Sequence, residues 1–470
     1  MRVTWVRPED LIAHELAASR QEGRPVGAIE ERWAAAGGSI RPPAGGAGQE
    51  PASPALRALA ERLLDELDAL PAGSGDAEPD DLPGIQALWP TSGGHDAGTG
   101  PAVRDRGDSG EGFGQAPAGA DRYERVHGAW LGRAIGCLLG KPVEKIPRQG
   151  IREILESTGR WPLSGYFTAV GLPEEVAARW PWNRASRATS LAENIDGMPE
   201  DDDLNYPLVA LHLLETVGPD FGSDDVAAAW LDLLPAGRVF TAERVAYRNM
   251  LLGMDPPHTA VHHNPFRQWI GAQIRTDVYG WASPGDPARA AELAWRDARI
   301  SHVRNGVYGA MYAAALGAAA VVESTVDRVL DAGLAVVPAG SRLAGAVRFA
   351  REVAAAEPEW ERVVDALYER YGDLHWVHVL PNAALLTAAL AHGRGDFVRS
   401  ICAVVSGGWD TDSSGATVGA VLGGLHGAAA LPPPWVEPLH NRLATSLPGF
   451  ARAGGIGFDE LAHRTVAVSS

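Results

Sequence analysis

Two ridges of glycine constrain the fold of this chain more than any other feature of its sequence. They are formed by Gly128, Gly132, Gly136 and Gly140 in one segment and by Gly415, Gly419, Gly423 and Gly427 in another. Residues four apart lie on one face of an α-helix. Because an interior glycine costs a helix about 1 kcal/mol relative to alanine, four of them need a compensating contact. Close approach of two helix backbones would supply it, so the spacing predicts two crossing, buried helices.

The same small-residue spacing also occurs where transmembrane helices dimerise. Here Arg133 and His426 interrupt the two segments, and belts of Trp and Tyr are missing from their ends. No stretch of about 18 residues is lipophilic enough to suggest a membrane span. We therefore expect buried helices of a soluble protein, without a membrane partner.

Several features bear on the compartment and on the partners. Only two cysteines, Cys137 and Cys402, are present, which is too few for a disulfide framework. Glu9 and Asp10 interrupt the start of the chain, where a secretory signal would need an apolar run. The formal net charge of −18 repels nucleic acid phosphates. We expect a cytoplasmic protein that does not bind nucleic acid.

The composition divides the chain into three parts. From residue 121 to residue 470, long Ala- and Leu-rich segments dominate and alternating β-branched runs are scarce, which predicts an all-α, compact multi-helix bundle. Residues 71–120 are rich in Gly and Pro and poor in apolar side chains, as in a flexible linker. Residues 1–70 predict a small N-terminal helical extension of unknown role, with the clearest apolar stripe at 53–70. We expect that removal of residues 1–120 leaves the activity of the main domain intact.

A first acidic cluster precedes an apolar helical segment. Glu200, Asp201, Asp202 and Asp203 are consecutive, so the carboxylates lie at a helix N-terminus. One or two of them would serve to cap the helix and to complement its dipole. Four adjacent carboxylates repel one another, and a hard divalent cation would offset that repulsion. Both interpretations remain open from this cluster alone.

A second acidic cluster, Asp410, Asp412 and Ser413, directly precedes the second glycine ridge. Its pattern matches the first half of a calcium-binding EF-hand loop, but Val421 stands where that loop needs a bidentate Glu. The pattern is also similar to the nucleophile loop of phosphatases of the haloacid dehalogenase group. Because the surrounding sequence lacks βαβ alternation, a magnesium-dependent phosphatase is kept as a distant alternative.

The donors in both clusters are oxygens, and neither cysteine pairs nor clustered histidines accompany them. Oxygen ligands favour magnesium, manganese or calcium over zinc or copper. Carboxylates shared between the two clusters could hold two ions. Bound cations would also allow a chain of this net charge to accept an anionic ligand.

Three segments, in this order along the chain, resemble the ADP-ribosylglycohydrolase family, which includes the enzyme that releases ADP-ribose from dinitrogenase reductase. They are GAWLGRAIGCLLGKPVE at 128–144, EDDD at 200–203 and GGWDTDSSGA at 407–416. With the intervening helices they cover roughly residues 121–465. The chain departs from the family pattern at Glu200, where relatives have Thr or Ser, and at Cys137, where many have Asp.

The resemblance implies two Mg²⁺ ions, with Mn²⁺ as the alternative metal. Their implied ligands are Glu200, Asp201, Asp202, Asp410, Asp412 and Ser413. The implied catalytic residues are Glu144, Asp201 and Asp412, and the implied substrate-binding residues are His302, Gly271 and Gln273. In this scheme the metal pair orients the ribose and a water molecule, while Glu144 or a ligand carboxylate assists proton transfer at the anomeric carbon.

The function implied by this resemblance is magnesium-dependent hydrolysis of an ADP-ribosyl glycosidic bond, in an ADP-ribosylated protein or a small ADP-ribose conjugate. Two other schemes stay open. A pair of carboxylates could perform glycosidic hydrolysis without metal. The chain could also be a catalytically inactive relative that binds ADP-ribose or has a structural role, because a fold does not guarantee turnover.

Overall fold

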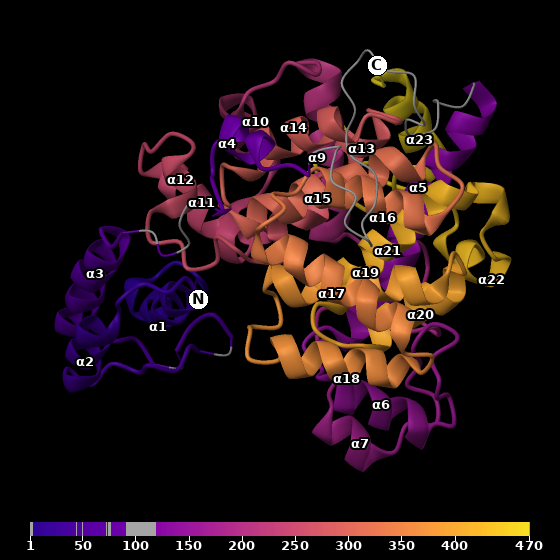
Figure 1. Ribbon diagram of the computed structural model, residues 1–470. Coiled ribbons are helices and arrows are strands. Elements are labelled where there is room, and N and C mark those ends of the chain that lie inside the picture. The colour runs from indigo at the N-terminus through magenta and orange to yellow at the C-terminus, as the bar shows by residue number, and fades with distance from the viewer. Residues whose placement is uncertain are drawn as a thin grey trace.

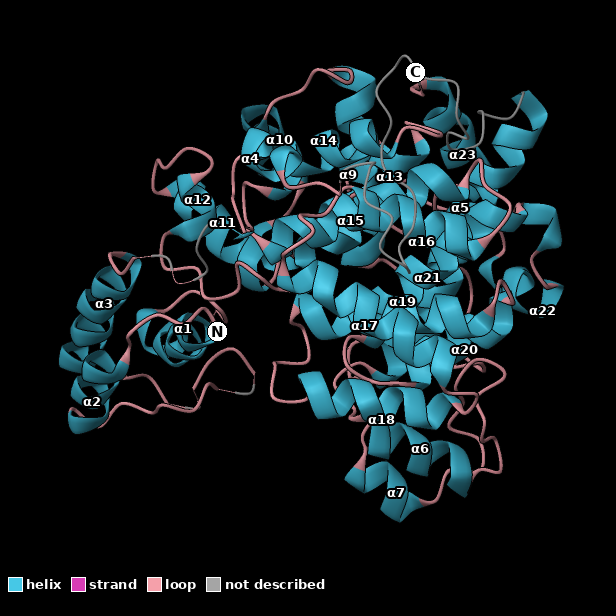
Figure 2. Cartoon of the chain, viewed as in Figure 1, coloured by secondary structure: helices cyan, strands magenta, loops and turns pink. Residues whose placement is uncertain are grey.

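The structure is a computed structural model that describes residues 3–43, 45–48, 50–71, 73, 77–90 and 119–469. The expected fold class, all-α, is confirmed: in these ranges helices and loops alternate, and pairing of extended backbone is limited to three isolated bridges (Figure 2). None of the described helices combines the length and the apolar character that a membrane span needs.

The helices follow one another along the chain without a sheet between them. The first half holds α1 (Pro8–Gln21), α2 (Gly27–Ala35), α3 (Pro54–Asp68), α4 (Leu82–Ala87), α5 (Gly119–Gly140), α6 (Arg148–Ser157), α7 (Glu174–Arg179), α8 (Arg187–Ser190), α9 (Asp202–Thr216), α10 (Ser223–Leu233), α11 (Thr241–Leu251) and α12 (His258–Val261). The second half holds α13 (Asp277–Trp281), α14 (Pro287–Ala298), α15 (Asn305–Ala320), α16 (Val326–Ala335), α17 (Arg342–Ala356), α18 (Trp360–Tyr371), α19 (Val379–Gly393), α20 (Phe397–Ser406), α21 (Thr411–His426), α22 (Pro433–Val436) and α23 (Phe458–Ala467).

The two glycine-ridge helices, α5 and α21, pack antiparallel in the interior of the main domain (Figure 1). A Cβ atom built on Gly132 would lie 2.0 Å from the carbonyl oxygen of Gly419, and one built on Gly136 would lie 1.9 Å from that of Gly415. Backbone therefore touches backbone along the whole contact, as the spacing predicted. The fully buried α15 and the nearly fully buried α19 pack against α21.

The N-terminal helices α1, α2 and α3 form a lobe beside the main domain (Figure 1). Ser53 caps α3 by accepting a hydrogen bond from the backbone N–H of Leu56 (3.2 Å). The leucines of α3 pack with α1 and α2 in a second hydrophobic cluster, and Phe266 and Trp269 of the main domain complete that cluster. The lobe therefore shares its core with the main domain.

Buried charges also hold this lobe in place. The guanidinium of Arg267 lies 2.7 Å from the Glu15 carboxylate and 2.9 Å from that of Glu22, with all three side chains almost fully buried. Gln268 adds a hydrogen bond of 2.7 Å to Glu22. Removal of one partner would leave a buried charge without compensation. The lobe is therefore held in the one position that keeps these charges paired.

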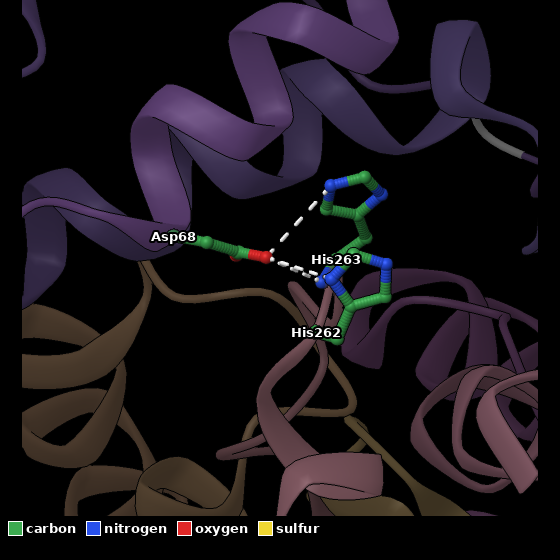
Figure 3. Close-up of side chains that lie close together, drawn as sticks. All are labelled: Asp68, His262 and His263. Atoms are coloured by element: carbon green, nitrogen blue, oxygen red, sulfur yellow. Dashed lines mark hydrogen bonds and ion pairs between the residues drawn. The ribbon is translucent and has the colours of Figure 1, made fainter. Parts of the chain in front are cut away.

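A second polar contact joins α3 to the loop after α12. Figure 3 shows Asp68 facing His262 and His263, and the His262 Nδ1 lies 3.3 Å from the Asp68 carboxylate. His263 lies 2.8 Å from Asp65. These side chains are close enough to hold a metal ion, but the two imidazole rings are stacked 3.9 Å apart at 26°. Because a metal lies in the plane of each imidazole that binds it, we interpret the group as a docking contact.

The segment expected to be a flexible linker, 71–120, lies mostly outside the described residues. The longest described stretch of it, 77–90, contains α4, and Ile85 of that helix is buried in the main hydrophobic core. Glu78 forms an ion pair with Arg342 (2.9 Å), and the backbone N–H of Arg304 donates to Asp80 (2.8 Å). Residues 77–90 therefore differ from the expectation, because alternating apolar and acidic side chains anchor them to the main domain.

Candidate functional site

A cavity of about 500 Å³ lies where α9 and α21 begin and where α5 ends. Both clusters singled out in the sequence line it, with Glu200, Asp201, Asp202 and Asp203 from the first and Asp410, Asp412 and Ser413 from the second. Glu144 and Glu243 add two further carboxylates to the lining. The structure thus brings side chains some 200 positions apart in the sequence to one cleft.

The glycine-ridge helices set the position of the second cluster. A Cβ on Gly140, at the end of α5, would lie 2.3 Å from the carbonyl carbon of Thr411, at the start of α21. The Thr411 hydroxyl donates a hydrogen bond of 2.9 Å to the Gly140 carbonyl. Asp410 and Asp412 flank Thr411, so the contact of the two helix ends fixes the carboxylates beside Glu144.

The first cluster begins α9, with Asp201 as the N-cap. Its carboxylate accepts a hydrogen bond of 2.9 Å from the backbone N–H of Asp203. Asp203 lies deeper and accepts a hydrogen bond from the Ser413 hydroxyl (3.2 Å), with the guanidinium of Arg133 3.5 Å away. Asp201 therefore both caps α9 and lines the cavity, while Asp203 is held by Ser413 at its deeper side.

Glu200 lines the cavity, but both of its carboxylate oxygens have protein partners. One accepts hydrogen bonds from Asn205 (3.0 Å) and from the Ser446 hydroxyl (2.6 Å), and the other forms an ion pair with Arg238. Burial alone would raise the pKa of Glu200, but the hydrogen bonds from Ser446 and Asn205 lower it. The negative charge of this predicted cation ligand is therefore already offset by protein groups.

Lys141 was not predicted as a site residue, and it lies in the middle of this acidic cavity. Its ammonium forms an ion pair with Asp201, and only 7% of the Lys141 side chain and 10% of the Asp201 side chain are exposed. Burial would lower the pKa of Lys141, but the charge and hydrogen bond of Asp201, together with the neighbouring Cys137 and Asp412, raise it. Burial would raise the pKa of Asp201, and Lys141 lowers it. Both groups are charged at neutral pH.

The remaining carboxylates repel one another. Burial, together with the charges of Asp201 and Asp412, raises the pKa of Asp202, and burial with the charge of Asp412 raises that of Asp410. Burial and the neighbouring Glu144 and Asp201 raise the pKa of Asp412 to about 7. The lysine and arginine contacts go to Asp201, Glu200 and Glu144 instead. Asp202, Asp410 and Asp412, of which the last two are buried, offer oxygen donors and excess negative charge, which fit a hard divalent cation.

Cys137 offers the one sulfur atom near these oxygens. Its Sγ lies 3.5 Å from the Asp201 carboxylate, and together with Asp203 the three side chains are close enough to surround an ion. Burial and then the charges of Asp201 and Asp203 raise the pKa of the thiol, so it stays protonated and donates to Asp201. Because the thiolate is the ligand that soft metals need, this thiol does not favour zinc.

Glu144 lies at the edge of the cavity, immediately after the short 3₁₀ helix Lys141–Val143. Its carboxylate accepts a hydrogen bond from the Asn183 amide and lies 3.1 Å from the Lys145 ammonium. The side chain is thus oriented by two partners while it faces the cavity.

The three predicted substrate-binding residues differ in their positions. Gly271 lines the cavity, and a Cβ there would meet the Glu243 carboxylate at 2.1 Å. Gln273 and His302 are buried and are not among the lining residues, so their contact with a ligand stays a prediction. His302 lies 2.8 Å from the Ser301 hydroxyl, and burial followed by the charge of Arg275 lowers its pKa. Its other ring nitrogen, Nε2, lies 3.9 Å from the carboxylate of Glu243, which lines the cavity.

The fold and the cavity define an all-α protein with carboxylates gathered at two helix N-termini. The chain belongs to the ADP-ribosylglycohydrolase family, whose model matches residues 118–467. Membership in this family supports hydrolysis of a glycosidic bond in an ADP-ribose conjugate.

Two further comparisons accompany this match. An uncharacterised protein of Archaeoglobus fulgidus is 25% identical over 335 residues, which cover 69% of this chain and 96% of that protein. A solved structure described as an ADP-ribosylglycohydrolase-related protein complex is 21% identical, with a TM-score of 0.45, and covers 74% of this chain and 98% of that chain. Residues 1–117 lie outside the family match.

Proposed function

We propose that this protein hydrolyses an ADP-ribosyl glycosidic bond with the help of magnesium. The observation that supports this proposal is the convergence of Asp202, Asp410 and Asp412 on one cavity in a member of this family. Burial, followed by the charges of neighbouring carboxylates, raises their pKa values, and a divalent cation would offset that negative charge. When bound, magnesium supplies Lewis-acid polarisation and lowers the pKa of a bound water molecule.

The residues that would hold the cation are Asp202, Asp410, Asp412 and Ser413. Asp201 already faces the Lys141 ammonium, which supplies one positive charge on the protein side of the cavity. The family resemblance implies that Asp201 is also a ligand of the two expected ions, and in this structure its carboxylate already has a cationic partner. Lys145 and Arg238 also line the cavity and offer positive charge to a diphosphate.

Glu144 is the proposed proton acceptor. It lies outside the group formed by Asp202, Asp410 and Asp412, and Asn183 and Lys145 orient its carboxylate at the cavity. In this position it would take the proton of the water molecule that attacks the anomeric carbon. A carboxylate held by hydrogen bonds within reach of the attacking water is what general-base catalysis requires.

One alternative keeps structural support, and another loses it. The Lys141–Asp201 ion pair and the protonated Cys137 depart from an all-carboxylate site, which favours the alternative of an ADP-ribose-binding relative without turnover. A phosphatase of the haloacid dehalogenase group would need a parallel sheet, whereas the described part of the chain is helical.

The experiment is incubation of the full chain with ADP-ribosyl-arginine, ADP-ribosyl-serine and O-acetyl-ADP-ribose, with Mg²⁺ or with EDTA, followed by mass spectrometry. We expect ADP-ribose from at least one conjugate with Mg²⁺, and loss of product with EDTA and in the Asp412→Asn variant. Product formation that persists in EDTA would favour the metal-free scheme. Binding of ADP-ribose without product from any conjugate would favour the non-catalytic relative.

A further inference from the structure

The cavity has an aromatic lining as well as an acidic one. Its aromatic residues are Trp5, Tyr206, Phe240, Trp269, His375 and Trp376. Trp5 belongs to the N-terminal extension, outside residues 118–467 that match the family. The extension therefore contributes a side chain to the cavity, whose other lining residues all lie within the family match.

The segment around Trp5 is fixed from both sides. The backbone N–H of Trp5 donates to the Gly46 carbonyl (2.8 Å), and a Cβ on Gly46 would lie 2.2 Å from the indole ring. On the other side, the Arg244 guanidinium of α11 donates to the hydroxyl (2.7 Å) and the carbonyl (3.2 Å) of Thr4. The Trp5 indole therefore packs against Gly46 of the extension, while the backbone of the adjacent Thr4 is hydrogen-bonded to the main domain.

Trp5 joins an aromatic group that is already ordered. Trp269 and His375 are stacked with their ring centres 4.2 Å apart and their planes at 11°. Trp5 meets Trp269 edge-on at 6.3 Å and 75°, and it meets Phe266 at 5.4 Å and 89°. Rings that are immobilised before a ligand arrives lose little freedom when a planar group stacks on them.

We propose that Trp5, with Trp269 and His375, forms a stacking platform for the planar base of a nucleotide, so that the N-terminal extension is part of the substrate site. The inference rests on the proposed function, and it assigns the base end of the substrate to the aromatic lining and the ribose end to the carboxylates. A cavity of about 500 Å³ is in the usual range for such ligands. Stacking does not depend on charge, so a chain of net charge −18 can use it for an anionic ligand.

This placement argues against the expectation that residues 1–120 can be removed without effect on activity. Without the lobe, the cavity would lose Trp5, and Trp269 would lose apolar neighbours from α1 and α3.

The test compares the full-length Trp5→Ala variant with the wild type by isothermal titration with ADP-ribose, AMP and ribose 5-phosphate. We expect ADP-ribose and AMP to bind about tenfold more weakly to the variant, as for the loss of one stacked base, and ribose 5-phosphate to bind as before. Trp5→Phe retains a ring and should retain most of the affinity. Val3→Ala is the matched control, because Val3 is 46% exposed and is not a lining residue.

Three results would overturn the platform: unchanged ADP-ribose binding in Trp5→Ala, an equal loss for ribose 5-phosphate, or a wild type that binds neither base-bearing ligand. If Trp5→Ala does not fold, Trp5→Leu keeps apolar packing without an aromatic face and is judged by the same results. A wild type that binds AMP and ADP-ribose through Trp5 but hydrolyses no conjugate would refute the proposed function and leave the platform intact.

Discussion

Replacement of Lys141 by methionine tests the electrostatic description of the cavity. The substitution keeps the length of the side chain and removes its charge. Asp201 then keeps the hydrogen bond from the Asp203 backbone and the contact with the Cys137 thiol, but it loses its buried cationic partner. Removal of one partner of a buried ion pair costs about 3–5 kcal/mol. At about 2 °C per kcal/mol for a domain of this size, the melting temperature in EDTA should fall by about 6–10 °C.

Magnesium should compensate for this loss. With the ammonium absent, Asp201 becomes an additional ligand, and a cation at 100 times its dissociation constant stabilises the folded state by about 2.7 kcal/mol. Mg²⁺ should therefore raise the melting temperature of Lys141→Met more than that of the wild type, and a Mn²⁺ titration should find more bound metal per chain.

Lys145 provides the matched control, because it is the only other lysine of the chain and its side chain is 64% exposed. Lys145→Met should change the melting temperature by no more than about 2 °C, since an exposed ion pair contributes at most about 1 kcal/mol. The reasoning is refuted if Lys141→Met has the melting temperature of the wild type in EDTA. It is also refuted if Mg²⁺ raises the melting temperature of Lys141→Met and of the wild type by the same amount.

Other parts of the structure yield three further predictions. Gly132→Ala should lower the free energy of unfolding by about 3 kcal/mol or more in chemical denaturation, because the new Cβ would meet backbone at 2.0 Å. The control Gly345→Ala has open space around its Cβ and should raise the free energy of unfolding by about 0.5–1 kcal/mol. Equal effects of the two substitutions would contradict the backbone contact. The folded-state pKa of Asp412, about 7, exceeds its ordinary value of 3.8, so the cation-free protein should lose stability as pH rises from about 4 to 7. The affinity for Mg²⁺ should increase over the same range, because the carboxylate becomes charged. A calorimetric titration that finds the same Mg²⁺ affinity at each pH would contradict this. Arg267→Met removes the cationic partner of the buried Glu15 and Glu22 carboxylates and should make α1–α3 sensitive to limited proteolysis. The control Arg20→Met removes an exposed ion pair and should leave α1–α3 protected. Equal protection of both variants would refute the anchoring role of Arg267.

The sequence predicted the helical class and the contact between the two glycine-ridge helices, because glycine at every fourth position weakens a helix unless another backbone packs against it. It also predicted the convergence of the clusters around Asp201 and Asp412, through the family resemblance. The composition of 71–120 hid the short helix around Ile85, because a few apolar side chains suffice to anchor a segment that is otherwise rich in Gly and Pro.

The rest could not be predicted, because the sequence does not show which way a side chain faces. Lys141 resembles an ordinary surface lysine in the sequence, and the one signal for its role was its place next to Gly140, where the chain leaves a buried helix pair. Trp5 depends on a contact between segments more than 200 residues apart. His302 and Gln273 were expected at the ligand from resemblance, and their burial follows from tertiary packing that no local pattern encodes.

The direct backbone contact between α5 and α21 leaves these two helices a single register. A shift of one helix by less than a turn would drive a side chain into the facing backbone, and a shift of a full turn would move the helix ends by about 5.4 Å. The main-chain contact between Gly140 and Thr411 therefore sets how far apart the backbone positions of Glu144 and Asp412 lie. Substitutions elsewhere in the core should change the stability of the protein long before they change the spacing of its reactive groups.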